Sequence, residues 1–163
     1  MINFRLAKEN DLDKLCNILD GIIENKPEGL NWSKDYPNRE VLKTDIEKGE
    51  LFVLEKGDIL GVVVLNSSED INYKNISWNS NKTPLVIHRL FIANDYMGKG
   101  YGKLLIEKII DKGRNDGFES IRLDTFSKNI NAQKLYTKSG FTYKGTINLD
   151  GKNGDFFCYE IKF

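Results

Sequence analysis

Histidine and cysteine are scarce in this chain of 163 residues. It has one histidine, His88, and two cysteines, Cys16 and Cys158, which form no Cys-x-x-Cys pair. Protein zinc sites use several cysteine and histidine ligands, so this small supply argues against one, and we expect no bound metal. Cys16 falls on the apolar face of an expected helix and Cys158 in a strand-like run. Both are therefore expected to be buried packing residues.

An excess of charge of either sign is also missing. Lysine and arginine number 24, aspartate and glutamate number 24, and the formal net charge is +0. Nucleic-acid-binding domains are usually basic, so we expect no nucleic-acid partner. The longest apolar run, 59–65, is too short to span a bilayer, and the first residues lack the apolar core of a signal peptide. We therefore expect a cytoplasmic protein with no membrane partner.

The composition that remains is typical of a globular domain, with 40% hydrophobic and 29% charged residues. The length predicts one domain over 1–163. Hydrophobic periodicity predicts strands and helices in the order β-α-α-β-β-β-α-β-α-β-β, an α/β or α+β sheet with helices on both faces. The expected strands cover 2–7, 51–55, 59–65, 85–92, 120–126, 141–146 and 156–161.

Helix ends and loops follow from local signals. Asn10 is expected to cap the first helix and Pro27 to end it, and Pro37 suits the first turn of the second. Gly49 and Gly140 are expected at helix C-termini. We interpret the asparagine-rich stretch 66–83 as a surface loop, and 150–154 as the turn of a closing hairpin.

A glycine-rich loop follows the strand 85–92. Gly98, Gly100 and Gly102 alternate where the next helix should begin, with Lys99 and Lys103 beside them. Glycine lets a ligand approach the backbone, and the first N–H groups of a helix lack internal partners and lie at the positive end of its dipole. The loop is therefore suited to hold a phosphate or pyrophosphate.

The spacing excludes two common phosphate motifs. A P-loop fails because Leu104 follows Gly102-Lys103 and Met97 lies five residues before Gly102. The dinucleotide fingerprint Gly-x-Gly-x-x-Gly fails because its third glycine would be Lys103. Taken alone, the loop could also be a glycine-rich turn that only caps a helix.

Two signatures at fixed spacing decide between these interpretations. Arg/Gln-x-x-Gly-x-Gly/Ala falls on 97–102 with Met97 at the first position, and Asn-x-x-Ala-x-x-Leu-Tyr-x-x-x-Gly-Phe falls on 129–141 without a gap. With the order of elements, these motifs resemble the GNAT superfamily of N-acetyltransferases over nearly the whole chain. The resemblance implies a mixed, mostly antiparallel twisted sheet of about seven strands with about four helices on both faces.

The resemblance also implies acetyl-CoA as cosubstrate. Backbone amides of the fourth strand would hold its pantetheine arm, backbone amides of the glycine loop its pyrophosphate, and Asn129 would bond the arm. Asn129 could instead only cap a helix or a turn. Met97 departs from the usual Arg or Gln, which removes a side-chain donor but leaves the backbone cradle. The implied cofactor-binding residues are Leu90, Phe91, Ile92, Met97, Gly98, Lys99, Gly100, Tyr101, Gly102, Lys103 and Asn129.

Two side chains are the catalytic candidates. Tyr136 matches the family tyrosine near the thioester sulfur, and a phenol with a pKa of about 10 can protonate a departing thiolate. The alternative is that Tyr136 only packs beneath Phe141. His88, in the strand before the loop, matches a histidine that some members use to receive the amine proton through water, but it could equally be a hydrogen-bonded core residue. Water or an unidentified carboxylate could also take that proton.

The acceptor pocket is expected between the first two helices, along the fourth strand and at the asparagine-rich loop. Its candidates are Trp32, Asp35, Tyr36 and Trp78, whose aromatic faces and carboxylate suit a cationic amine, although the tryptophans could simply cover the core. The expected activity is acetyl transfer from acetyl-CoA to a primary amine of a small molecule or amino-acid-like substrate. The alternatives are a protein or peptide N-acetyltransferase and a non-catalytic CoA-binding module. The chain could be a monomer or a homodimer.

Overall fold

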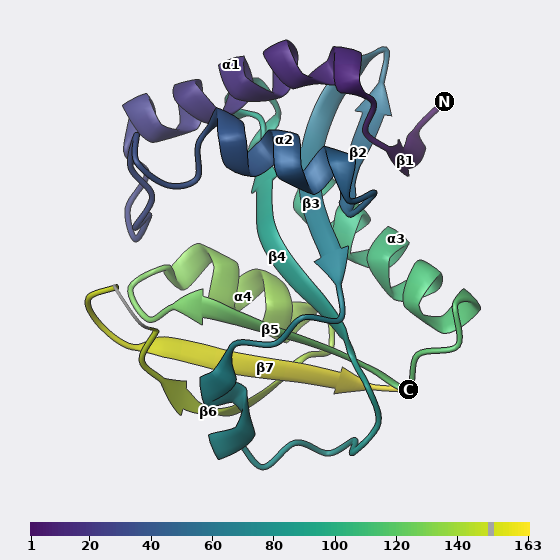
Figure 1. Cartoon of the computed structure of the whole chain (residues 1–163), viewed down its shortest axis with the longest axis vertical. Coiled ribbons are helices and arrows are strands. Elements are labelled where there is room, and N and C mark those ends of the chain that lie inside the picture. Colours follow the sequence, from purple (N-terminus) through teal and green to yellow (C-terminus); the bar gives the residue numbers. More distant parts are fainter. Residues whose placement is uncertain (150–151) are drawn as a thin grey trace. The chain divides into compact units, whose positions relative to one another are not determined.

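The computed structural model describes residues 1–149 and 152–163, so Asp150 and Gly151 of the expected closing turn lie outside the described part. Its strands are β1 (Asn3–Leu6), β2 (Leu51–Lys56), β3 (Asp58–Asn66), β4 (Leu85–Ile92), β5 (Ser120–Phe126), β6 (Thr142–Ile147) and β7 (Phe156–Lys162) (Figure 1). Its α-helices are α1 (Leu12–Asn25), α2 (Arg39–Glu47), α3 (Tyr101–Asn115) and α4 (Ile130–Lys138), and 3₁₀ turns η1 (Glu9–Asp11), η2 (Ile71–Asn75) and η3 (Asn94–Tyr96) connect some of them.

The strands form a seven-stranded mixed sheet in the order β1-β2-β3-β4-β5-β7-β6. This confirms the expected mixed sheet with four α-helices. The chain divides into two compact units, one of residues 1–65 with 88–105 and the other of residues 66–87 with 106–163. The strand β4 therefore begins in the second unit and ends in the first.

In the first unit, β1, β2 and β3 pair antiparallel. Gly57, with φ 71°, makes the tight β2–β3 turn. The helices α1 and α2 supply apolar side chains to a core on these strands, because α1 buries one stripe at helical spacing. The buried members of this core are Leu12, Leu15, Leu19, Ile22, Leu42, Leu51, Val53, Ile59, Val62, Val64 and Phe91.

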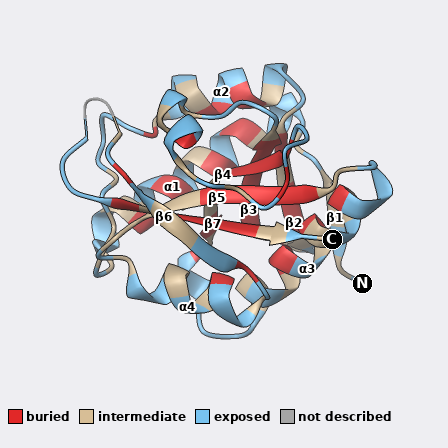
Figure 2. Cartoon of the chain, turned by 90° about the horizontal axis from the view of Figure 1, so that it is seen from below, coloured by how far each residue is buried: buried red, intermediate tan, exposed pale blue. Residues whose placement is uncertain are grey.

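In the second unit, β5, β7 and β6 pair antiparallel, and the start of β4 pairs parallel with β5 at Leu85↔Ile121 and Val86↔Arg122. A second core cluster gathers Tyr73, Val86, Ile147, Phe156 and Cys158. Figure 2 shows buried positions concentrated along the strands and exposed positions along the outer sides of the helices.

Two expected helix starts are wrong. Asn10 does not cap α1: it lies inside η1, and Asp11, whose carboxylate accepts from Lys8 N and Arg5, stands at the N-cap position. Pro37 does not enter the first turn of α2. It follows a cis peptide bond, and Asn38 caps the helix by accepting from Val41 N at 3.1 Å. At α2 the side-chain acceptor of Asn38, one residue further along, sets the boundary, whereas Asp11 makes no side-chain capping bond to α1.

The expectation of a surface loop at 66–83 is also wrong in part. The segment contains η2, and Tyr73 and Ser80 on it are 2% and 3% exposed. Its aromatic residues pack on the second core cluster, which is why the segment is held down despite its polar composition.

None of the helices in the described residues combines the length and apolar character needed to cross a bilayer.

Candidate active site

The glycine loop has the backbone that the sequence predicts. Gly98 and Gly100 have φ 73° and 88°, a region that favours glycine, and α3 begins directly afterwards at Tyr101. Added Cβ atoms at both glycines would have no heavy atom within 4 Å, and residues 97–100 are exposed. The loop therefore presents the first amides of α3 beside open space, as an anion cradle requires.

Side chains before the loop fix it to the rest of the first unit. Tyr96 Oη donates to Asp58 Oδ2 at 3.1 Å, in the β2–β3 turn, and Asn94 Nδ2 donates to the carbonyl of Gly21 on α1 at 2.9 Å. The Tyr96 ring meets Tyr101 edge to face at 6.1 Å, and Lys99 Nζ lies 5.8 Å from the Tyr96 ring centroid. The cradle is thus anchored at its entry.

Arg89 has a backbone conformation that the sequence did not predict. It lies in the middle of β4 with φ 44°, in the left-handed region that non-glycine residues rarely adopt. Such a residue interrupts the regular alternation of a strand, and strained backbone of this kind clusters at functional sites. Arg89 immediately precedes Leu90, Phe91 and Ile92, the residues that the resemblance assigns to the pantetheine arm.

The side chain of Arg89 explains how that conformation is held. Its Nε and Nη2 donate to the two oxygens of Asp45 on α2, at 2.8 and 2.6 Å, and its Nη1 donates to Tyr36 Oη at 2.9 Å. Asp45 is 4% exposed. A bidentate, largely buried ion pair of this geometry fixes both partners. It therefore ties β4 to α2 and to the segment between α1 and α2.

That segment carries three of the acceptor candidates. Trp32 packs edge to face on Phe91 of β4, with ring centroids 5.7 Å apart. Tyr36 is 37% exposed and is held by Arg89, and Asp35 is exposed beside it. The structure brings Trp32, Tyr36 and β4 together, although the packing of Trp32 on the core is also the alternative interpretation. Their role toward a substrate stays a prediction.

The second signature lies at the start of α4. Asn129 is the N-cap, and its Oδ1 accepts from Ala132 N at 3.1 Å. The helix-capping interpretation of Asn129 is confirmed, and binding of the pantetheine arm stays a prediction that the cap does not contradict. Gly140, with φ 98°, follows the end of the helix as expected.

Tyr136 on α4 is 6% exposed, and its ring contacts Phe141 at 5.8 Å and Tyr159 at 6.2 Å. Burial, with the negative charge of Asp124, raises the pKa of Tyr136 well above its ordinary value, so the phenol keeps its proton at neutral pH. Within the described residues its hydroxyl makes no hydrogen bond, yet it is not among the fully enclosed unpaired oxygens, which belong to Ser120 and Ser139. The ring is therefore packed, and no hydrogen bond within the described residues engages the hydroxyl.

One pair of polar side chains in the second unit escaped the sequence analysis. Tyr73 Oη donates to Asp124 Oδ2 at 2.6 Å, between η2 and β5. Burial raises the pKa of Asp124, against the lowering effects of the Tyr73 hydrogen bond and of Lys152. The available signal was the alternation of charged residues at 122 and 124 with apolar residues at 121 and 123.

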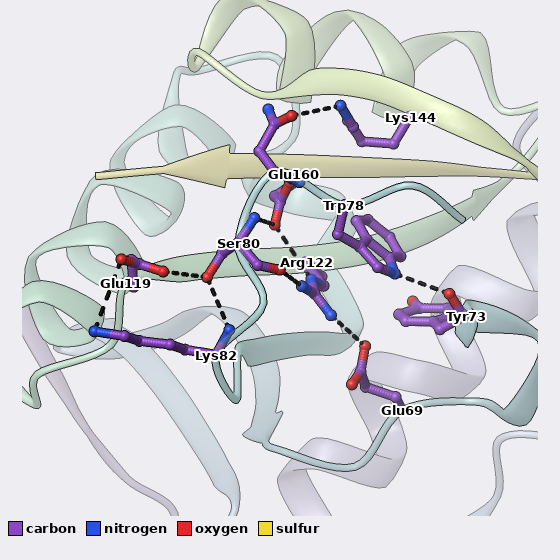
Figure 3. A network of polar contacts seen from close by, with 10 residues as sticks. Glu69, Tyr73, Trp78, Ser80, Lys82, Glu119, Arg122, Lys144 and Glu160 are labelled. Atoms are coloured by element: carbon purple, nitrogen blue, oxygen red, sulfur yellow. Dashed lines mark hydrogen bonds and ion pairs between the residues drawn. The ribbon is translucent and has the colours of Figure 1, made fainter. Parts of the chain in front are cut away.

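Figure 3 shows the polar network that holds the segment 66–83 in the second unit. Arg122 bonds Glu69 at 2.8 Å and the fully buried Glu160 at 3.3 Å, and it also donates to the carbonyl of Ser80. Its guanidinium lies 4.5 Å from the Trp78 ring centroid, while Trp78 Nε1 donates to the carbonyl of Tyr73 at 2.8 Å (Figure 3). These contacts show that Trp78 covers the second core cluster. Its contact with the acceptor substrate stays a prediction.

The candidates thus fall into two groups. The first unit holds the glycine loop, residues 90–92, Trp32, Asp35, Tyr36 and the half-buried His88; the second holds Asn129, Tyr136 and Trp78. The roles assigned to these residues, including that of His88, stay predictions. Among the described residues, no group of three or more histidine, cysteine or acidic side chains is arranged to hold a metal ion.

A mixed sheet with a left-handed residue in β4, followed by exposed glycines at the start of α3, defines a protein suited to bind a phosphate-bearing ligand. The family comparison names the class: the model of the Acetyltransferase (GNAT) family matches residues 17–141. The chain belongs to this family.

Individual relatives agree with this assignment. An acetyltransferase of the GNAT family from Streptococcus agalactiae has the same fold, with a TM-score of 0.83 over 99% of this chain and 95% of that one, at 24% identity. The chain is 33% identical over 67 residues to the spermine/spermidine N(1)-acetyltransferase of Bacillus subtilis, covering 40% of this chain and 44% of the relative. It is 30% identical over 95 residues to the N-acetylaspartate synthetase of Xenopus tropicalis, covering 58% of this chain and 31% of the relative. The chain therefore matches less than half the length of these curated relatives.

Proposed function

We propose that the chain transfers an acetyl group from acetyl-CoA directly to a primary amine of a small molecule. The observation that supports it most is the exposed loop of Gly98 and Gly100 at the start of α3, combined with a buried, protonated Tyr136. In this proposal, backbone amides at 90–92 and 98–103 bind the cofactor and Asn129 bonds its pantetheine arm. The phenol of Tyr136 then protonates the departing thiolate.

The acceptor amine would lie near Trp32, Asp35 and Tyr36 of the first unit, or near Trp78 of the second. Aromatic faces and a carboxylate attract a cation, and one curated relative is named for spermine and spermidine. The attacking amine must lose a proton, and either His88 or a carboxylate is proposed to receive it. A histidine fits because its ordinary pKa lies near neutrality.

A panel of amines with acetyl-CoA tests this proposal. Spermine, spermidine, L-aspartate and a short lysine peptide are incubated separately, and free thiol release is followed together with the mass of the product. We expect acetylation of at least one small amine. Acetylation of the peptide alone would favour the protein N-acetyltransferase alternative, and cofactor binding without turnover would favour a CoA-binding module.

The cradle is tested separately by calorimetric titration with acetyl-CoA. Gly100→Val places a branched side chain in the open space beside the first amides and strains a residue with φ 88°. We expect binding to be abolished, whereas Lys99→Ala should weaken it only in a salt-dependent way, since Lys99 is exposed. If Gly100→Val binds as well as the wild type, the pyrophosphate is held elsewhere.

A further inference from the structure

Asp124 is a half-buried carboxylate on β5 that lacks a cationic partner. Its Oδ2 accepts from Tyr73 Oη at 2.6 Å, and its register partner across the sheet is Cys158 on β7. Within the described residues, no basic nitrogen lies within 4.0 Å of it. Buried acidic side chains are usually paired, so this one is unusual.

The second oxygen of Asp124, Oδ1, is not used by a contact of the fold that the structure describes. Oδ1 makes no hydrogen bond within the described residues, and it is not among the fully enclosed unpaired oxygens. The neighbouring groups do not neutralise it: the Tyr73 phenol and the Cys158 thiol are neutral, because burial raises the pKa of Tyr73 well above 10 and that of Cys158 to about 12. The charge of Lys152 lowers the pKa of Asp124, and that of Asp70 raises it.

We propose that Asp124 binds the ammonium group of the acceptor through Oδ1 and takes its proton, with Tyr73 holding the other carboxylate oxygen in place. This inference rests on the proposed function and narrows its substrate class to alkylamines that are cationic at neutral pH. Acceptors with carboxylates of their own are disfavoured, because Asp70 and Asp124 together would repel them.

The proton and bond changes balance as follows. The acceptor ammonium gives one proton to Asp124 Oδ1, and the neutral amine attacks the thioester carbonyl. The C–N bond forms, the C–S bond breaks, and Tyr136 gives its proton to the thiolate. The nitrogen loses its second proton as the amide forms, and that proton restores the Tyr136 phenol. Asp124 finally releases its proton to water.

Asp124 also contributes to the pKa of Tyr136, the proposed acid. Burial and, to a smaller extent, the negative charge of Asp124 raise the pKa of Tyr136, so the resting phenol is a weak acid. When Asp124 takes up the ammonium proton, this charge disappears and Tyr136 becomes a stronger acid at the stage at which it must donate.

Asp124→Asn is the first test, because asparagine keeps the size and can still accept from Tyr73. With spermine as the probe, we expect kcat/KM for the amine to fall by about 10²–10⁴-fold while the KM for acetyl-CoA stays unchanged. Asp111→Asn is the matched control, since Asp111 is an exposed aspartate of the same unit. A value for Asp124→Asn within about twofold of the control would overturn the proposal.

Tyr73→Phe is the second test and keeps the carboxylate. The lost hydrogen bond had lowered the pKa of Asp124, so that pKa rises in the variant. A base acts only when deprotonated, and the acidic limb of the pH–kcat/KM profile should therefore move to higher pH. An unmoved limb, or loss of the limb in His88→Ala, would overturn the assignment to Asp124. A wild-type protein that acetylates no amine would instead refute the proposed function itself.

Discussion

Asp45 and Asp124 show two ways in which this fold removes an aspartate from water. Asp45, in the first unit, gives both oxygens to the guanidinium of Arg89 and is 4% exposed. Asp124, in the second unit, gives one oxygen to a phenol and keeps the other open. Both oxygens of Asp45 are occupied, and their bonds to Arg89 hold β4 and α2 together. Asp124 has one oxygen without a hydrogen bond in the described residues, which we propose binds a proton or a cation.

The partner of each carboxylate decides this difference. A guanidinium stabilises the charged form and saturates it geometrically. A neutral phenol stabilises the charged form only weakly, so burial dominates and the pKa of Asp124 rises. Burial alone therefore does not distinguish a carboxylate that stabilises the fold from one that is proposed to take part in the reaction.

The largest expected effect is on kcat and comes from Tyr136, the proposed acid of the second unit. Tyr136→Phe keeps the ring contacts with Phe141 and Tyr159 and removes the hydroxyl. Steady-state kinetics should show kcat lower by about 10²–10⁴-fold, with the KM for acetyl-CoA little changed. Full kcat in a folded variant would reduce Tyr136 to a packing residue.

Removing the charge of Asp45, the carboxylate paired with Arg89, should lower the free energy of unfolding. Asp45→Asn leaves Arg89 largely buried without its counter-charge, so urea unfolding should show a loss of about 3–5 kcal/mol. Asp13→Asn breaks the exposed ion pair with Arg39 and is the control, with an expected loss much smaller than that of Asp45→Asn. Equal losses in the two variants would mean that burial adds nothing to the Asp45 pair.

The two capping asparagines provide a matched comparison between the units. Asn129→Ala and Asn38→Ala each remove a side-chain acceptor at 3.1 Å from a helix N–H, so each should cost about 1 kcal/mol in unfolding experiments. Asn129→Ala alone should also raise the KM for acetyl-CoA more than it lowers kcat. An unchanged KM would leave Asn129 with the capping role only.

The smallest expected effect is that of Asp124→Asn on the free energy of unfolding, and its sign is opposite to that of Asp45→Asn. A carboxyl whose folded pKa is raised stabilises the fold at low pH and loses that contribution as the pH rises through its folded pKa. Asp124→Asn should therefore raise the free energy of unfolding at pH 7, by about 1.4 kcal/mol for each unit of the upward pKa shift. The gain should vanish in urea titrations at acidic pH, and destabilisation at pH 7 would contradict it.

Much of the fold was predictable because its signals are local. The strands 85–92 and 120–126 match β4 and β5, and the turn glycines and the loop before α3 fall where the pattern indicated. The spacing of Asn129, Tyr136 and Phe141 located the second signature because a helix fixes such intervals.

The rest depended on contacts between residues distant in sequence. Tyr73 and Asp124 are 51 residues apart, and Arg89 and Asp45 are 44 apart, so no local pattern reports either pair. The left-handed Arg89 was unpredictable for the same reason, because its conformation is stabilised by Asp45 rather than by its neighbours in the strand. Polar composition suggested that 66–83 lies on the surface, yet Tyr73 and Trp78 pack against the second core cluster.

The central claim is that Asp124 is an open carboxylate whose affinity for a proton is raised by the fold. Carbon-13 NMR titration of the aspartate carboxyl groups measures this directly in the resting protein. We predict an inflection for Asp124 above the ordinary aspartate value of about 3.9, moving further upward in Tyr73→Phe. An inflection at or below the ordinary value, or a downward movement in Tyr73→Phe, would contradict the claim.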